Sequence, residues 1–261
     1  MSKQAYGGST GLTCPGNVCE IFSGIQGEGL MIGERQIFVR LAGCNLSCAF
    51  CDTPSAREPA ETCRVERTAG ARNFAMVSNP IAAFDVVKYV EKLDTYRRVH
   101  HSVALTGGEP LMQAEFAAEL VRELKRKEFW VFLETNGSLP NELAGVIRYV
   151  DMVSMDVKLP GTACCPDLLV EHERFLRRAA QVGVYVKVVL TSATSTDELL
   201  AAAKMVCEVN PTIPLVLQPA SPNGEIKPPS PAQVLDWQLQ CKLHLPNVRV
   251  IPQCHKIMGQ L

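Results

Sequence analysis

Three cysteines lie close together in the stretch GCNLSCAFCDT, which covers residues 43–53. The CxxxCxxC spacing of Cys44, Cys48 and Cys51 allows one loop to turn three thiolates toward a common centre. Three thiolates around a four-iron cluster leave one iron open for a substrate or cofactor. A structural zinc site normally adds a fourth Cys or His, and Cys63 is the nearest candidate. The spacing therefore indicates a metal centre and leaves structural zinc and plain core thiols as alternatives.

The elements that must position this loop alternate between strands and helices along the chain. Short apolar runs bounded by turn signals predict strands, and longer segments with helical periodicity predict helices. The predicted strands cover 36–43, 102–106, 130–136, 152–156, 184–190, 215–218 and 248–251. The predicted helices cover 81–99, 112–127, 141–148, 167–181, 196–208 and 231–242. About six βα units indicate a single α/β domain that forms an incomplete TIM-type barrel, with an open doubly wound sheet as the alternative.

The composition limits the kinds of protein that this chain can be. Its 26 basic and 27 acidic residues almost balance, which argues against direct binding of nucleic acid. No apolar run approaches the length of a membrane span, and the first residues lack an apolar signal region, so we expect a cytoplasmic protein with no membrane partner. Eleven cysteines in such a chain fit reduced thiols and a metal site better than a disulfide scaffold.

A second motif, TGGEP at residues 106–110, follows the second predicted strand. Gly107 and Gly108 lack side chains, so their carbonyls and the Glu109 carboxylate can approach an ammonium group closely. Alone, this motif is typical of a strand-ending turn. Together with the cysteine loop and Phe50, the aromatic residue before its third cysteine, it resembles the radical S-adenosylmethionine (SAM) superfamily.

The resemblance extends to one family within that superfamily. The stretch EIFSGIQGEGLMIGERQIFVRLAGCNLSCAFCDT (20–53) is similar to the N-terminal signature of the 7-carboxy-7-deazaguanine synthases. Further matches are LETNGS (133–138), SMDVK (154–158), LQP (217–219) and PQCHK (252–256), so the likeness covers nearly the whole chain. It implies a radical ring contraction of 6-carboxy-5,6,7,8-tetrahydropterin to 7-carboxy-7-deazaguanine with loss of ammonia, in queuosine biosynthesis. It also implies a [4Fe-4S] cluster on the three cysteines, bound SAM and Mg²⁺, a homodimer, and an electron donor such as flavodoxin or ferredoxin.

The resemblance implies a set of residues around the pterin substrate. Glu134 lies toward the end of a predicted strand, where barrel enzymes place catalytic groups, and would exchange a proton; a satisfied polar strand end is the alternative. Gln26 offers an acceptor and two donors to the pterin edge, and Gly27 permits close backbone approach, with a glycine-rich turn as the alternative. The implied substrate contacts are Ile25, Gln26, Gly27, Arg40 and Thr106.

Two of the implied ligand contacts have specific alternatives. Arg40 would meet an anion such as a carboxylate, or else form an ion pair with Glu28 or Glu109. Thr53 occupies the magnesium position of the family, and Mg²⁺ commonly keeps several waters and takes one or two protein or substrate oxygens. Following Asp52, Thr53 could equally cap a helix.

Further residues are expected to bind SAM by the same resemblance. Ser154, Asp156 and Lys158 alternate along one strand and therefore share a face. The implied SAM contacts are Gly107, Gly108, Glu109, Ser154, Asp156, Lys158 and Gln218. We expect one radical SAM core over residues 1–261, with an N-terminal segment for substrate and cluster and a C-terminal closing segment that contains His255 and Lys256.

Some features stay open, and two other functions compete. The long connection 57–80 has no assigned role, and the cysteines outside the loop form no second dense array. A glycyl-radical-enzyme activase would share the cysteine loop, but IQGEG, Arg40 and Thr53 favour a small carboxylated substrate. A non-enzymatic iron-sulfur or zinc module would not need the GGEP motif.

Overall fold

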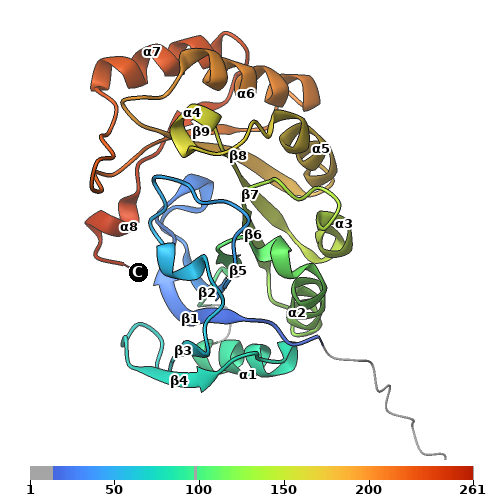
Figure 1. Ribbon diagram of the computed structural model, residues 1–261. Coiled ribbons are helices and arrows are strands. Elements are labelled where there is room, and N and C mark those ends of the chain that lie inside the picture. Colours follow the sequence, from blue (N-terminus) through green and yellow to red (C-terminus); the bar gives the residue numbers. More distant parts are fainter. Residues whose placement is uncertain (1–13, 97–98, 261) are drawn as a thin grey trace, which may run out of the picture.

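A mixed sheet is the framework of the protein, in a computed structural model that describes residues 14–96 and 99–260 (Figure 1). Over these residues it has ten strands in the order β10-β9-β8-β7-β6-β5-β2-β1-β3-β4. The strands are β1 Val18–Ile25, β2 Arg35–Leu41, β3 Thr62–Glu66, β4 Phe74–Ser78, β5 Ser102–Gly107, β6 Val131–Thr135, β7 Met152–Val157, β8 Gly183–Leu190, β9 Leu215–Pro219 and β10 Val248–Val250. Strand β2 and strands β5 to β10 run parallel, whereas β1 is antiparallel to β2 and β4 is antiparallel to β3.

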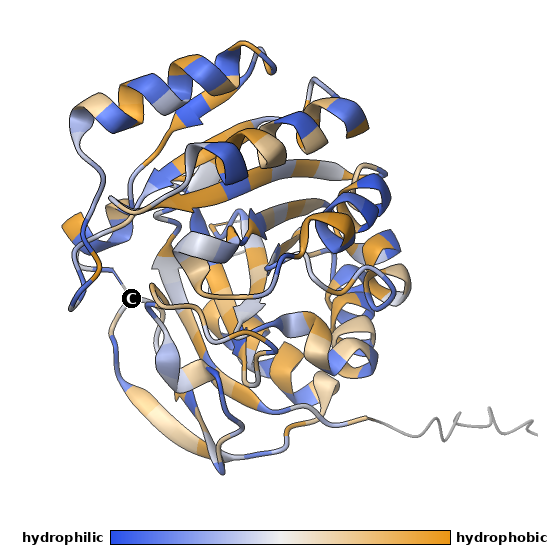
Figure 2. Ribbon diagram, turned by 45° about the horizontal axis from the view of Figure 1, so that its top comes forward, coloured by the Kyte–Doolittle hydropathy of each residue, from blue (hydrophilic) through white to orange (hydrophobic). Residues whose placement is uncertain are grey.

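Helices cover the outer face of the parallel strands (Figure 1). They are α1 Ala83–Leu93, α2 Ala114–Arg126, α3 Leu143–Val146, α4 Pro160–Ala163, α5 Leu169–Ala179, α6 Thr196–Val209, α7 Pro231–Lys242 and α8 Cys254–Ile257, with the 3-10 turns η1 Gly29–Met31, η2 Pro54–Ala56, η3 Pro110–Gln113 and η4 Ile147–Tyr149. The strands are mainly hydrophobic, and the helices mix hydrophobic with hydrophilic residues (Figure 2). None of the helices within the described ranges is long and apolar enough to cross a membrane.

The sheet has apolar side chains on both faces, as a buried parallel sheet requires. Val103 and Leu105 belong to the large core under the outer helices. Ala104, between them, belongs to a smaller inner cluster with Phe22, Phe38, Phe132, Tyr185 and Val216. Because neighbouring side chains alternate across a strand, the curved sheet encloses this inner cluster. The arrangement confirms the expected incomplete TIM-type barrel.

All the strands predicted from the sequence are present, and the predicted helix at 141–148 is divided into α3 and η4. Strands β1, β3 and β4 were not predicted. The connection 57–80 contains β3 and β4, which form an antiparallel hairpin, and β3 extends the sheet beyond β1. This part of the chain is therefore an extension of the sheet.

Candidate active site

The inner face of the barrel becomes polar toward the carboxyl ends of the parallel strands. Ala104 and Phe132 belong to the inner apolar cluster, and Thr106 and Glu134 lie two residues further along β5 and β6. Beyond the apolar layer lies a cavity of about 420 Å³. Among the predicted site residues, those that line it are Ile25, Gln26, Gly27, Arg40, Cys44, Cys48, Cys51, Thr53, Thr106, Gly107, Gly108, Glu134, Ser154, Asp156, Lys158 and Gln218.

The cysteine loop runs from the end of β2 to η2 and is fastened near both ends. The Gly43 amide donates to the Ala56 carbonyl (2.9 Å), and the Cys44 amide donates to the Arg57 carbonyl (3.1 Å). The Arg57 guanidinium donates to the Cys48 carbonyl (2.6 Å). Burial raises the pKa of the Cys48 thiol to about 11 and also raises the pKa of Cys44. Binding as thiolates must displace these protons, and three thiols on one cavity fit a cluster with one open iron.

The two glycines of TGGEP pack against backbone, Gly108 against the cysteine loop and Gly107 against the last residue of β2. A Cβ atom on Gly108 would lie 2.2 Å from the Gly43 carbonyl oxygen. A Cβ atom on Gly107, where φ is +145°, would lie 2.2 Å from the Leu41 carbonyl oxygen. The Glu109 amide also donates to the Gly43 carbonyl (2.8 Å). These glycines therefore make their close approach to the end of β2 and to the cysteine loop, and their contact with an ammonium group stays a prediction.

Glu109 lies behind the cavity wall and is fully buried. Its carboxylate accepts hydrogen bonds from the Leu111 amide (3.0 Å), the Thr135 hydroxyl (2.9 Å) and the Asn136 amide (2.7 Å). Burial outweighs these donors and raises the pKa of the Glu109 carboxyl group to about 7. Protein groups therefore hold this carboxylate, and its expected contact with SAM stays a prediction.

Glu134 is held by two hydrogen bonds at the cavity. Its Oε1 accepts from Gln26 Nε2 (2.7 Å), and its Oε2 accepts from the Thr106 hydroxyl (2.7 Å). Gln26 Nε2 also donates to Gln36 Oε1 (3.0 Å), and Gln26 Oε1 accepts from the Glu28 amide (3.0 Å). Gln26 and Thr106, which the sequence assigns to the substrate, thus orient the carboxylate of Glu134.

Arg40 is paired with a carboxylate that the sequence analysis did not name. Its Nε donates to Glu20 Oε1 (2.9 Å), and the two side chains are each 15% exposed. Arg40 and Glu20 are opposite each other in the antiparallel register of β1 and β2. The alternative partners expected from the sequence are engaged elsewhere, Glu28 with Lys187 and Glu109 with Asn136. The Arg40 side chain nevertheless lines the cavity.

Lys187 on β8 is a cavity residue that the sequence analysis missed. Its ammonium group pairs with Glu28 and with Asp156 Oδ2 (3.2 Å), and Asp156 Oδ2 also pairs with Lys158 (2.9 Å). Burial alone would raise the pKa of Glu28, but the charge and hydrogen bond of Lys187 lower it to about 2. The sequence did indicate a special role for Lys187, because it is the single charged residue in the apolar run YVKVVL.

Two acceptor atoms of the predicted SAM contacts are left without partners. Asp156 Oδ1 and Gln218 Oε1 are buried, and neither has a hydrogen-bond partner within residues 14–96 and 99–260. A buried acceptor without a partner costs about 1–3 kcal/mol. Both residues line the cavity, so a ligand that supplies hydrogen-bond donors would relieve this cost. The hydroxyl and amino groups of SAM are donors of this kind.

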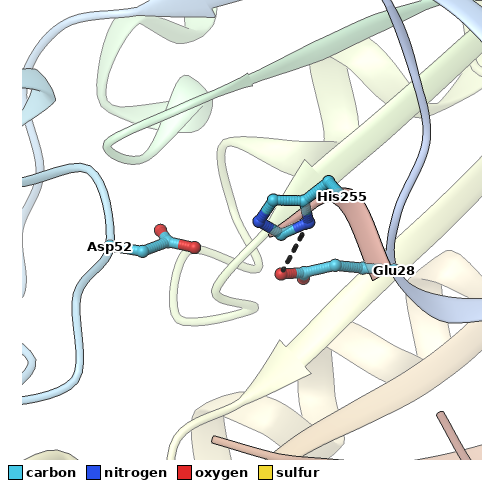
Figure 3. A group of neighbouring side chains, drawn as sticks. All are labelled: Glu28, Asp52 and His255. Carbon is cyan, nitrogen blue, oxygen red and sulfur yellow. Dashed lines mark ion pairs between the residues drawn. The ribbon is translucent and has the colours of Figure 1, made fainter. Parts of the chain in front are cut away.

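Potential metal ligands come together beside the cysteine loop. Glu28, Asp52 and His255 each place one ligand atom within 4.8 Å of the others (Figure 3). The dashed line in Figure 3 is the ion pair between His255 Nδ1 and Glu28 Oε1 (3.9 Å). The Thr53 hydroxyl donates to Asp52 Oδ1 (3.1 Å). Thr53 precedes η2 without a side-chain capping bond, which removes the support for its role as a helix cap. The carboxylate and hydroxyl oxygens of Glu28, Asp52 and Thr53 are of the kind that Mg²⁺ prefers, whereas the His255 nitrogen is not.

The C-terminal segment around α8 (Figure 1) contributes Gln253, His255, Lys256 and Gln260 to the lining of the cavity. The Cys254 amide donates to the Gly27 carbonyl (2.8 Å). Gln253 Nε2 donates to Glu28 Oε1 (2.9 Å) and Asp52 Oδ2 (3.1 Å). A Cβ atom on Gly27 would lie 2.3 Å from the His255 backbone nitrogen. Because Gly27 has no side chain, the C-terminal segment can pack against its backbone. The expected contact of Gly27 with the substrate stays a prediction.

Gly27→Ala is expected to displace the C-terminal segment while the barrel stays folded. Overpacking of this kind costs about 1–3 kcal/mol, so amide hydrogen exchange in residues 253–260 should quicken by roughly fivefold or more. Gly145→Ala is the matched control, because a Cβ there meets no atom within 4 Å. Exchange in 253–260 that is the same in the Gly27 variant and in the wild type would disprove the close contact.

Comparisons with known proteins agree with this geometry. Residues 39–161 match the radical SAM superfamily. A 7-carboxy-7-deazaguanine synthase of Geobacter sulfurreducens is 42% identical over 244 residues, which is 93% of this chain and 96% of the relative. One of Methanopyrus kandleri is 36% identical over 256 residues, with 96% and 97% covered. The crystal structure of QueE from Escherichia coli shares the fold, with a TM-score of 0.57, 21% identity, and coverage of 92% and 94%.

The matches extend over nearly the whole chain and nearly the whole of each relative. The chain belongs to the 7-carboxy-7-deazaguanine synthase family of radical SAM enzymes.

Proposed function

We propose that this chain converts 6-carboxy-5,6,7,8-tetrahydropterin to 7-carboxy-7-deazaguanine, with loss of ammonia, in the pathway to queuosine. One observation supports this most strongly. The three cysteines that follow β2 and the Glu134 carboxylate of β6 line the same cavity of about 420 Å³. A radical generated at the cluster would therefore arise beside a group that can exchange a proton with the substrate.

The chain's own residues position and enclose the reactants. When bound at a reduced cluster, SAM supplies a 5′-deoxyadenosyl radical. Cys44, Cys48 and Cys51 would hold that cluster at the end of β2. Glu134, oriented by Gln26 and Thr106, would accept and return a proton during the rearrangement.

Two other parts of the cavity support binding of the ligands. Asp156 and Gln218 would accept hydrogen bonds from SAM through the oxygen atoms that otherwise lack partners. The C-terminal segment would exclude water from the reaction.

Turnover with the pterin is the direct test of the proposed function. The anaerobically reconstituted and reduced protein should consume the tetrahydropterin carboxylate and SAM and release the deazaguanine carboxylate, as followed by mass spectrometry. SAM cleavage without this product would favour an activase-like protein or another substrate. The absence of any SAM cleavage by a fully loaded cluster would favour a non-enzymatic binding module.

The magnesium site has its own test at Thr53. Thr53→Val keeps the shape and removes the oxygen, so cluster content and SAM cleavage without substrate should survive. Productive turnover should fall by roughly a hundredfold, because the substrate carboxylate would lose the cation that orients it. Thr53→Ser should retain more activity and respond to added Mg²⁺. A valine variant with the magnesium response of the wild type would rule out the ligand role.

Three further expectations complete the proposal. The electron donor would be a flavodoxin or ferredoxin, the protein would act in the cytoplasm, and it would form a homodimer. The homodimer rests on the resemblance to the family. Sedimentation that shows a monomer independent of concentration would exclude it.

A further inference from the structure

Asn45, the residue after the first cluster cysteine, takes part in a closed ring of hydrogen bonds with Asn136 and Ser138. Asn45 Nδ2 donates to the Ser138 hydroxyl oxygen (2.8 Å), and that hydroxyl donates to Asn136 Oδ1 (2.5 Å). Asn136 Nδ2 then donates to Asn45 Oδ1 (2.9 Å). These three side chains, called the asparagine ring below, connect the cysteine loop to the segment that follows β6.

The direction of the hydrogen bonds in the asparagine ring is fixed by the backbone. The Ser138 amide, which can donate but not accept, donates to Asn136 Oδ1 (3.0 Å). Asn136 must therefore turn its amino group toward Asn45, which in turn places the amino group of Asn45 on Ser138. Both carboxamides are set in one orientation, so the ring has a single arrangement.

The asparagine ring is bound to Glu109, the buried acid of the GGEP motif. The backbone amide of Asn136 donates to Glu109 Oε2 (2.7 Å), and its carbonyl accepts from His172 Nε2 (3.0 Å). Burial lowers the pKa of His172 to about 4, so its ring is neutral at pH 7. Asn136 and Ser138 are only 6% and 7% exposed. Asn136 thus binds Glu109 through its backbone and the cysteine loop through its side chain.

We infer that Asn45 and Ser138 are positioning residues, which fix the cysteine loop relative to Glu109 and thereby set the geometry in which SAM meets the cluster. This inference rests on the proposed use of SAM and adds two residues that do not line the cavity. Bound at the open iron and at the GGEP motif together, SAM would span the two parts that the ring joins. A misplacement of about an ångström can cost roughly a hundredfold in rate, so a rigid connection matters at this place.

The test compares Asn45→Ala, Ser138→Ala and the double variant with the wild type, all as cluster-loaded protein at matched iron content. Ser47→Ala is the control, because Ser47 lies exposed in the same loop and its hydroxyl bonds to no described residue. The first readout is the change that added SAM produces in the electron paramagnetic resonance spectrum of the reduced cluster. The second is the dissociation constant for SAM. Neither readout requires the pterin.

Each single variant should weaken SAM binding by about fivefold to tenfold and diminish the spectral change. The double variant should be no worse than the singles, because either change opens the ring. Single variants that match the wild type at equal iron content would overturn the inference, as would two effects that add in the double variant. The Asn45 variant changes the cysteine loop itself and could load the cluster poorly. Ser138→Ala leaves the whole cysteine loop native, so this variant tests the inference even in that case.

A third readout separates this inference from the proposed function. With the pterin present, the open ring should increase the 5′-deoxyadenosine formed per product by about tenfold or more, since the radical would be generated out of place. If the wild type makes no deazaguanine product, the proposed function fails while the two SAM readouts still decide on the ring. If the wild type makes the product and the variants show an unchanged ratio together with unchanged SAM readouts, the ring inference alone fails.

Discussion

Replacing Cys44, Cys48 or Cys51 by alanine is expected to abolish SAM cleavage and to lower the iron bound after anaerobic reconstitution. Each of these thiols lines the cavity at the end of β2. Three thiolates hold a four-iron cluster and leave one iron open, so the loss of any one of them leaves a second iron without its protein ligand. The expected loss of activity is complete, which makes this effect the largest that we predict.

Cys207→Ala provides the control for the cluster cysteines. Cys207 lies on α6 and packs against the outer core, away from the cavity, so this variant should bind iron and cleave SAM as the wild type does. Iron and sulfide analysis and the visible absorption spectrum measure the bound cluster, and a SAM cleavage assay measures the activity of each variant. A triple alanine variant that kept a full cluster would show that other cysteines hold it.

Most of the parallel strands could be predicted because they are buried on both faces, and the edge strand β10, with Arg249 exposed, is the exception. The run YVKVVL of β8 is apolar at nearly every position, which is the signature of a strand between two covered layers. The hairpin of β3 and β4 lacks this signature. Thr62 and Arg64 on β3 are exposed, and β4 is half exposed at the edge of the sheet. Strand β3 pairs with β1, which lies some 40 residues earlier, and β4 pairs with β3, so the local sequence carries little sign of either strand.

The site residues were assigned through the resemblance to the synthase family. The position of Glu134 toward the end of a strand agreed with that assignment, because barrel enzymes place catalytic groups at the carboxyl ends of their strands. The partners of the site residues could not be assigned, because pairing depends on register between distant segments. Arg40 meets Glu20 through the β1–β2 register, and Lys187 reaches Glu28 across the barrel. The role of Gly27 was likewise hidden, since the atoms that it admits belong to His255 near the other end of the chain.

Glu134→Gln is expected to leave the fold, the cluster and SAM cleavage without substrate intact, and to reduce product formation by roughly a hundredfold to ten-thousandfold. The introduced carboxamide has nearly the shape of the carboxylate that it replaces. Its oxygen can still accept from Gln26 Nε2, and its amino group can donate to Thr106, whose hydroxyl is free to turn. The geometry of the network is thereby kept, while the group that can exchange a proton is removed.

The control for Glu134 is Glu115→Gln, which removes an exposed carboxylate at the start of α2, outside the cavity. Product and 5′-deoxyadenosine are measured together at matched iron content, so that chemistry on the pterin is separated from cleavage of SAM. A large fall in product with normal SAM cleavage assigns Glu134 to the rearrangement. Product formation at the wild-type rate would refute a role in proton exchange, because an amide cannot take over the proton that a carboxylate accepts. Loss of SAM cleavage in the absence of pterin would instead indicate that Glu134 acts in the binding or cleavage of SAM, not on the pterin.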